Sequence, residues 1–135
     1  MIKSYAAASL ISFVSFVVLD FIWLSYATKI VYRPNIGNLL LEKPIFSAAI
    51  AFYLLYAIGL SLLVIRPAMT SESVITAIWM GAVFGLITYG TYDLTNLATL
   101  KGWSLSVTLI DMFWGATLTA ISSGFGVWIV LKFHS

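Results

Sequence analysis

Three aspartates lie inside long stretches of the chain that hold no other charged residue, where a carboxyl group can bind a proton, a cation or a polar head group. They are Asp20, Asp93 and Asp111. A charged side chain near the centre of a membrane-spanning helix costs about 2.5–3.5 kcal/mol on insertion scales. Because such residues usually mark a pathway or a binding site, these three carboxyl groups are the first candidates for a functional site.

Aromatic side chains recur one helical turn away from two of these aspartates. The pattern Asp-x-x-Trp occurs at Asp20 and Trp23 and again at Asp111 and Trp114. An indole ring at that spacing can shield a carboxyl group from lipid and donate its N–H, although tryptophans of an interfacial aromatic belt are the alternative interpretation. With the polar residues on the helix of Asp93, the candidate ligand- or proton-binding set is Asp20, Asp93, Asp111, Asn96, Tyr89, Tyr92, Trp23 and Trp114.

The composition excludes several other kinds of site. The chain has no cysteine and a single histidine, His134, so disulfide frameworks, zinc sites and Ser-His-Asp triads are not expected within one chain. Seven basic residues against five acidic ones give a net charge of +2 without any basic run, which excludes a nucleic-acid partner. No cofactor and no resident metal are predicted.

The elements that position these residues are predicted to be membrane-spanning helices. Of the 135 residues, 61% are hydrophobic and 9% charged, whereas soluble domains have about 45–50% and about 25%. Lipid must therefore be the solvent. Uncharged runs long enough to cross a bilayer predict a single domain, 1–135, with an all-α bundle of four transmembrane helices at about 4–28, 45–65, 74–97 and 104–131.

Turn signals separate these helices and set their topology. The segments after Arg33-Pro34 and Arg66-Pro67 are predicted to be outside the helices, because proline disrupts a helix interior. Four crossings place both termini on the same side, and the three aspartates then fall in one layer toward the loops 29–44 and 98–103. Basic residues divide three to four between the sides, so the positive-inside rule assigns no orientation. The two groups are Lys3, Arg66 and Lys132 against Lys29, Arg33, Lys43 and Lys101.

The tract from Tyr89 to Trp103, YGTYDLTNLATLKGW, resembles the signature of a family of small bacterial membrane proteins, domain-of-unknown-function family 2177. The segments DMFWG, starting at Asp111, and LDFIW, starting at Leu19, are similar to other recurring segments of that family. The resemblance extends over nearly the whole chain. It implies a multi-pass protein of the bacterial inner membrane with four helices, and it implies no catalytic residue.

Three functional hypotheses from different classes follow. In the first, the aspartates form an intramembrane acidic pocket that binds or transports a proton, a cation or a small amphiphilic, lipid-like molecule; transport by so few helices would require a homodimer. In the second, the carboxyl groups hold Mg²⁺ in a membrane enzyme that modifies lipid or fatty-acyl groups. In the third, the chain is a ligand-free scaffold or assembly subunit.

Two further expectations concern packing. Gly81, Gly85 and Gly115 are expected to let neighbouring helices approach closely. If the aspartates are structural instead of functional, ion pairs with Lys29, Arg33 or Lys101 are the expected way of satisfying them, since these bases are predicted on the same side of the membrane.

Overall fold

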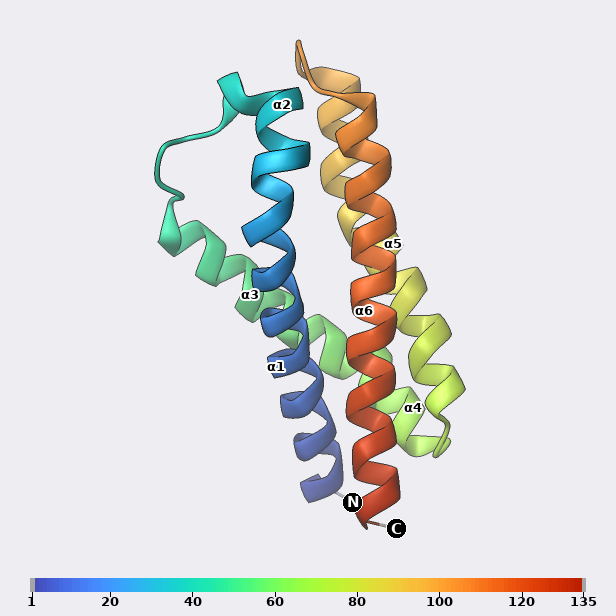
Figure 1. Ribbon diagram of the computed structural model, residues 1–135. Coiled ribbons are helices and arrows are strands. Elements are labelled where there is room, and N and C mark those ends of the chain that lie inside the picture. The colour runs from blue at the N-terminus through green and yellow to red at the C-terminus, as the bar shows by residue number, and fades with distance from the viewer. Residues whose placement is uncertain (1, 135) are drawn as a thin grey trace.

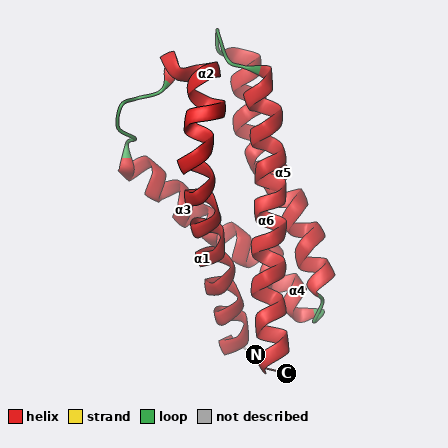
Figure 2. Cartoon of the chain, in the orientation of Figure 1, coloured by secondary structure: helices red, strands yellow, loops and turns green. Residues whose placement is uncertain are grey.

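Four apolar helical rods make up the computed structural model, which describes residues 2–134. The rods span Ile2–Leu39, Phe46–Thr70, Val74–Thr99 and Leu105–Phe133, and each is long and apolar enough to cross a membrane. Within the described residues the chain forms only helices and short connections, with no strand (Figure 2). The predicted all-α bundle of four long apolar helices is confirmed.

Two of the rods are built from several helical segments. The first rod comprises α1 (Ile2–Ala27), η1 (Thr28–Tyr32), α2 (Arg33–Ile36) and η2 (Gly37–Leu39). The second comprises α3 (Phe46–Leu60), η3 (Ser61–Ile65) and α4 (Arg66–Thr70). The third and fourth rods are the single helices α5 (Val74–Thr99) and α6 (Leu105–His134).

The first rod continues past the proline that was expected to lie outside it. The segment η1 is a π-helical turn in which the Arg33 N–H donates to the carbonyl of Thr28, five residues earlier. Pro34 follows at the start of α2. A proline lacks the N–H that an α-helix needs and clashes with the carbonyl four residues back, and the wider π-turn removes both conflicts. The rod therefore extends to Leu39 where the sequence predicted an end near Thr28.

The second rod repeats this solution. In the π-helical turn η3 the Arg66 N–H donates to the carbonyl of Ser61, and Pro67 lies directly after it at the start of α4. The helix again continues, here to Thr70 in place of the predicted Ile65. Both Arg-Pro pairs therefore lie inside helical rods.

The helix α6 is the central element, packed most extensively against α5 and then α1. Glycines bring these helices close together. A Cβ atom at Gly85 of α5 would lie 2.2 Å from the carbonyl oxygen of Gly115 in α6. Eleven residues further along α6, a Cβ atom at Gly126 would lie 2.0 Å from the Ser12 hydroxyl of α1. No side chain fits at either place, so the backbones themselves are in contact.

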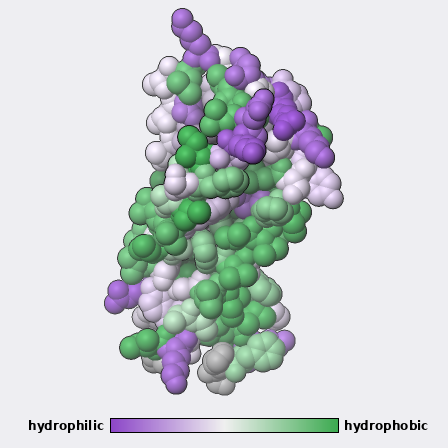
Figure 3. Space-filling view, turned by 90° about the vertical axis from the view of Figure 1, so that its left-hand side faces the viewer, coloured by the Kyte–Doolittle hydropathy of each residue, from purple (hydrophilic) through white to green (hydrophobic). Residues whose placement is uncertain are grey.

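The arrangement in space is an elongated bundle with one oblique member. Figure 1 shows α1, α5 and α6 running along the long axis, whereas α3 crosses obliquely and its N-terminal end lies apart from the others. The start of α1 and the end of α6 lie at the same end of the bundle (Figure 1). In Figure 3 hydrophilic residues gather toward the two ends and a mainly hydrophobic belt lies between them, as expected for a bundle that crosses a membrane.

The interior of the bundle combines an apolar core with a set of buried polar residues, while many large apolar side chains lie on its surface. Large apolar side chains such as Phe21, Leu55 and Phe113 are more than 70% exposed. The buried polar residues are Ser12, Asp20, Asp93, Thr108, Asp111, Thr119, Ser122 and Ser123. Polar groups in lipid need partners inside the protein, and the candidate aspartates lie accordingly on the inward faces of α1, α5 and α6.

The substitution Gly85→Ala is expected to lower the free energy of unfolding by about 1–3 kcal/mol despite the higher helix propensity of alanine, because the new Cβ overlaps the Gly115 carbonyl and pushes α5 away from α6. Gly37→Ala is the matched control, since its Cβ would meet only an ordinary contact at 3.9 Å. Unfolding by sodium dodecyl sulfate, followed by circular dichroism, measures both. Equal stabilities of the two variants would contradict the close packing of α5 on α6.

Candidate functional site

The three aspartates come from three helices and converge. Asp20 of α1, Asp93 of α5 and Asp111 of α6 are 7%, 0% and 8% exposed. Asp111 lies near enough to both of the others for its charge to act on them directly. The structure therefore brings together the carboxyl groups that the sequence predicted in one layer.

Neutral donors from two other helices bind Asp20. The Tyr53 hydroxyl of α3 donates to Oδ2 at 2.7 Å, and the Trp114 indole Nε1–H of α6 donates to Oδ1 at 3.2 Å. Both carboxyl oxygens of Asp20 are thus satisfied without a basic residue. Each bond joins two helices, so the oblique helix α3 is fixed to the bundle at this level.

A second set of donors serves Asp111. The Tyr32 hydroxyl, at the end of η1, donates to Asp111 Oδ1 at 2.5 Å. The same hydroxyl accepts the indole Nε1–H of Trp23 at 3.0 Å. Trp23, Tyr32 and Asp111 therefore form a chain of hydrogen bonds that runs from the first rod to α6.

Each of the two tryptophans acts on the aspartate of the other helix. Trp114, which follows Asp111 on α6, donates to Asp20 of α1, while Trp23, which follows Asp20 on α1, serves Asp111 through Tyr32. Their rings stack with centroids 4.5 Å apart and an interplanar angle of 12°. The expected indole donors are present, but each tryptophan acts on the aspartate of the opposite helix.

Tyr32 was not among the predicted site residues, because the sequence placed it in a loop. Nine residues separate Trp23 from Tyr32, about two and a half turns of a regular α-helix, which would put the two side chains on opposite faces. The π-turn η1 takes up an additional residue and returns Tyr32 to the face of Trp23. The indication available from sequence was a hydroxyl-bearing aromatic residue directly before Arg33-Pro34.

Asp93 differs from the other two carboxyl groups. It is fully buried, and neither Oδ1 nor Oδ2 has a hydrogen-bond partner. Its neighbour is the carboxyl group of Asp111. A buried polar group without a partner is costly, so this unpartnered carboxyl is the feature of the site that most needs an explanation.

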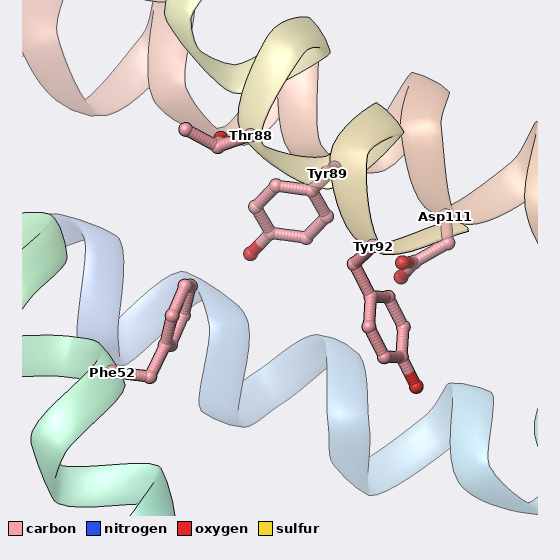
Figure 4. Close-up of a pocket in the computed structure, with 5 residues that line it drawn as sticks. All are labelled: Phe52, Thr88, Tyr89, Tyr92 and Asp111. Atoms are coloured by element: carbon pink, nitrogen blue, oxygen red, sulfur yellow. The ribbon is translucent and has the colours of Figure 1, made fainter. Parts of the chain in front are cut away.

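A pocket of about 310 Å³ adjoins the carboxyl groups, lined by Phe52, Thr88, Tyr89, Tyr92 and Asp111 (Figure 4). The rings of Phe52, Tyr89 and Tyr92 form most of its wall, and Asp111 supplies the charge-bearing group. Phe52 and Tyr92 are about half exposed on the outside of the bundle. The pocket therefore has an aromatic wall, a carboxyl group and an edge at the surface of α3 and α5.

The predicted residues divide between the pocket and the hydrogen-bond network. Tyr89, Tyr92 and Asp111 line the pocket, while Asp20, Trp23, Asp93 and Trp114 belong to the buried cluster beside it. Asn96 is half-buried one turn beyond Asp93 and does not line the pocket. Phe52, Thr88 and Tyr53 complete the site and were not in the predicted set of site residues.

Trp103, in the α5–α6 loop, packs on Tyr92 at the edge of the pocket. The indole Nε1–H of Trp103 donates to the buried Thr108 hydroxyl at 3.0 Å, and the Trp103 and Tyr92 rings meet edge to face at 5.5 Å. The bond to Thr108 fixes the Trp103 ring at the start of α6.

Basic side chains are not the partners of these carboxyl groups in the part of the chain that the structure describes. The hydrogen bonds to the aspartates come from Tyr32, Tyr53 and Trp114. Lys29, Arg33 and Lys101, which were expected to form the ion pairs of a structural site, are exposed. Among residues 2–134, no group of three or more acidic or histidine side chains is placed to hold a metal ion.

Comparison with known proteins gives one match. A family model described as "Predicted membrane protein (DUF2177)" matches residues 3–128, which is most of the chain. No curated protein and no solved structure matches.

The substitution Tyr32→Phe tests the hydrogen-bond chain. Removal of the hydroxyl leaves the Trp23 indole and Asp111 Oδ1 without partners, which is expected to lower the free energy of unfolding by about 1–3 kcal/mol. Tyr26→Phe, on the same rod at a side chain that is 70% exposed, is expected to change it by less than about 0.5 kcal/mol. Detergent unfolding curves compare them. If both variants are as stable as the wild type, Tyr32 does not reach into the bundle.

Proposed function

We propose a binding function for this chain, which belongs to the DUF2177 family of predicted membrane proteins. It is a multi-pass membrane protein that takes up a small amphiphile from the lipid phase, with the apolar part of the ligand against the aromatic wall of the pocket and the head group at Asp111. Its location in the bacterial inner membrane is part of the proposal and rests on the family resemblance.

The observation that carries this proposal is the pocket itself. Its volume of about 310 Å³ lies at the lower end of the range for small-molecule sites. Aromatic walls with one polar group that fixes orientation are the usual composition of such sites. Here the walls are Phe52, Tyr89 and Tyr92, and the polar group is Asp111.

The position of the opening favours entry from lipid. Phe52 and Tyr92 at the edge of the pocket are 45% and 55% exposed, and they lie on spans whose outer surfaces are apolar. Toward the α5–α6 loop, the Trp103 ring packs edge to face on Tyr92, and its indole N–H donates to Thr108. A ligand dissolved in the bilayer therefore meets the opening directly.

The carboxyl cluster selects the chemistry of the head group. Asp111 offers hydrogen-bond acceptors, so an alcohol or an amine fits it. A carboxylate or a phosphate would meet the negative charge at Asp111, and like charges at low dielectric repel strongly. The ligand class is therefore a small apolar molecule with a hydroxyl or amino head group.

The other hypotheses receive less support from the geometry. A metal-dependent enzyme acting on lipid or fatty-acyl groups needs a set of metal ligands, and the described residues hold none. A ligand-free scaffold does not account for an aromatic pocket beside an unpartnered carboxyl. Proton or cation binding is compatible with the same aspartates but does not account for the apolar wall.

The binding function is tested by the midpoint of thermal unfolding in dodecyl maltoside micelles. Decanol, decylamine or decanoate is added at equal mole fraction. Decanol and decylamine are expected to raise the midpoint of the wild type, and decanoate is not. A ligand at about one hundred times its Kd stabilises a protein by about 2.7 kcal/mol. Asp111→Asn is expected to abolish the advantage of decylamine over decanol, because it removes the charge that an ammonium group would pair with.

A matched pair of variants distinguishes binding in the pocket from a general effect of the additive on the micelle. Phe52→Ala removes part of the aromatic wall and is expected to abolish the response to decanol. Phe125 is equally exposed, at 45%, and lies outside the pocket, so Phe125→Ala is expected to keep the response. Equal responses of the two variants, or equal effects of all three additives on the wild type, would contradict the proposal.

A further inference from the structure

We infer that Asp93 and Asp111 share one proton, so that the interface of α5 and α6 contains a proton-binding carboxyl pair. The inference goes beyond amphiphile binding and does not require it, because Asp93 does not line the pocket. The pair is formed by this chain alone, with one carboxyl group buried and the other in contact with the pocket.

Burial without partners is the first step of the argument. Asp93 has no exposed surface, and both of its oxygens lack hydrogen bonds. An isolated carboxylate in such a place would bear the full cost of desolvation, and proteins respond to that cost by keeping the group neutral or by pairing it. The bases predicted on this side, Lys29, Arg33 and Lys101, are exposed. A proton is then the remaining means of neutralisation.

The helix geometry explains why Asp111 is the partner. Close contact of Gly85 with Gly115 sets the register of the antiparallel pair α5 and α6, and places Asp93 and Asp111 about one turn apart along the axis. Side chains lean toward the N-terminus of their own helix. In an antiparallel pair at this offset the two leans are opposite, so the carboxyl groups approach each other across the interface.

The hydrogen bonds leave one suitable oxygen on Asp111. Its Oδ1 accepts the Tyr32 hydroxyl at 2.5 Å, and Oδ2 is the atom left for a proton shared with Asp93. Two adjacent carboxyl groups in a low dielectric do not both ionise, and the first proton bound belongs to the pair. The pair therefore carries one negative charge, which the Tyr32 hydroxyl stabilises.

The other titratable groups that face the pair are all acidic or neutral. They are Asp20 from α1, Tyr32 from η1, and Tyr89 and Tyr92 from α5, each close enough to Asp111 to sense its charge. Asp20 brings a further carboxyl group and no basic charge that could replace the proton. Its own oxygens accept hydrogen bonds from Tyr53 and Trp114, which makes Asp20 a suitable control for an acid with partners.

Infrared spectroscopy detects a protonated carboxyl group by its C=O stretching band. The purified protein is measured at neutral pH in dodecyl maltoside, because this detergent has no ester carbonyl. The wild type is expected to show this band. Asp93→Asn, which keeps the shape of the side chain, is expected to lose it, whereas Asp20→Asn is expected to retain it. A wild type without the band, or a band that survives Asp93→Asn, would overturn the inference.

A further variant separates a shared proton from one held by Asp93 alone. Asp111→Asn leaves Asp93 beside a neutral amide, so the band is expected to remain but to shift in frequency. An unshifted band would show that Asp111 takes no part. Should Asp93→Asn fail to fold, the wild type still decides, because the band must disappear as the pH is raised and return when it is lowered; a band absent throughout would refute the shared proton.

Discussion

Hydrogen bonds from aromatic side chains to buried carboxyl groups are the interaction on which the rest of the structure depends. In lipid there is no water to satisfy a carboxylate, so each partner must come from another part of the chain. Asp20 accepts hydrogen bonds from Tyr53 and Trp114, and Asp111 accepts one from Tyr32. These bonds join the first rod, α3 and α6, and the stable position of each helix follows from the need to satisfy the acids of its neighbours.

Several features of the backbone serve this arrangement. Contact of Gly126 with Ser12 brings α1 close to α6, which allows the rings of Trp23 and Trp114 to stack at 4.5 Å. The π-turn η1 carries Tyr32 back to the site. The π-turn therefore has two effects, since it accommodates a proline and it adds a donor to the network. The pocket lies beside this hydrogen-bond network, and Asp111 belongs to both.

The sequence predicted the parts of this site that depend on regular helical spacing. Uncharged runs located the four rods, helical spacing indicated the close glycines of α5 and α6, and the direction of the four crossings placed the three aspartates in one layer. Tyr32 was not predicted as a site residue, because its position depends on an irregular turn that helical periodicity does not represent. The partners of Asp20 and the isolation of Asp93 could not be predicted either, because they depend on the angle between helices and on side-chain packing.

The central claim is that the tryptophan of each of the helices α1 and α6 acts on the aspartate of the other helix. Nuclear magnetic resonance of ¹⁵N-labelled indole groups tests it most directly. The signals are assigned by Trp→Phe substitutions and compared between the wild type and Asp20→Asn. This arrangement predicts the larger shift, and the faster hydrogen exchange, at the indole N–H of Trp114 on the opposite helix. A change concentrated at Trp23, one turn away on the same helix as Asp20, with Trp114 unaffected, would contradict it.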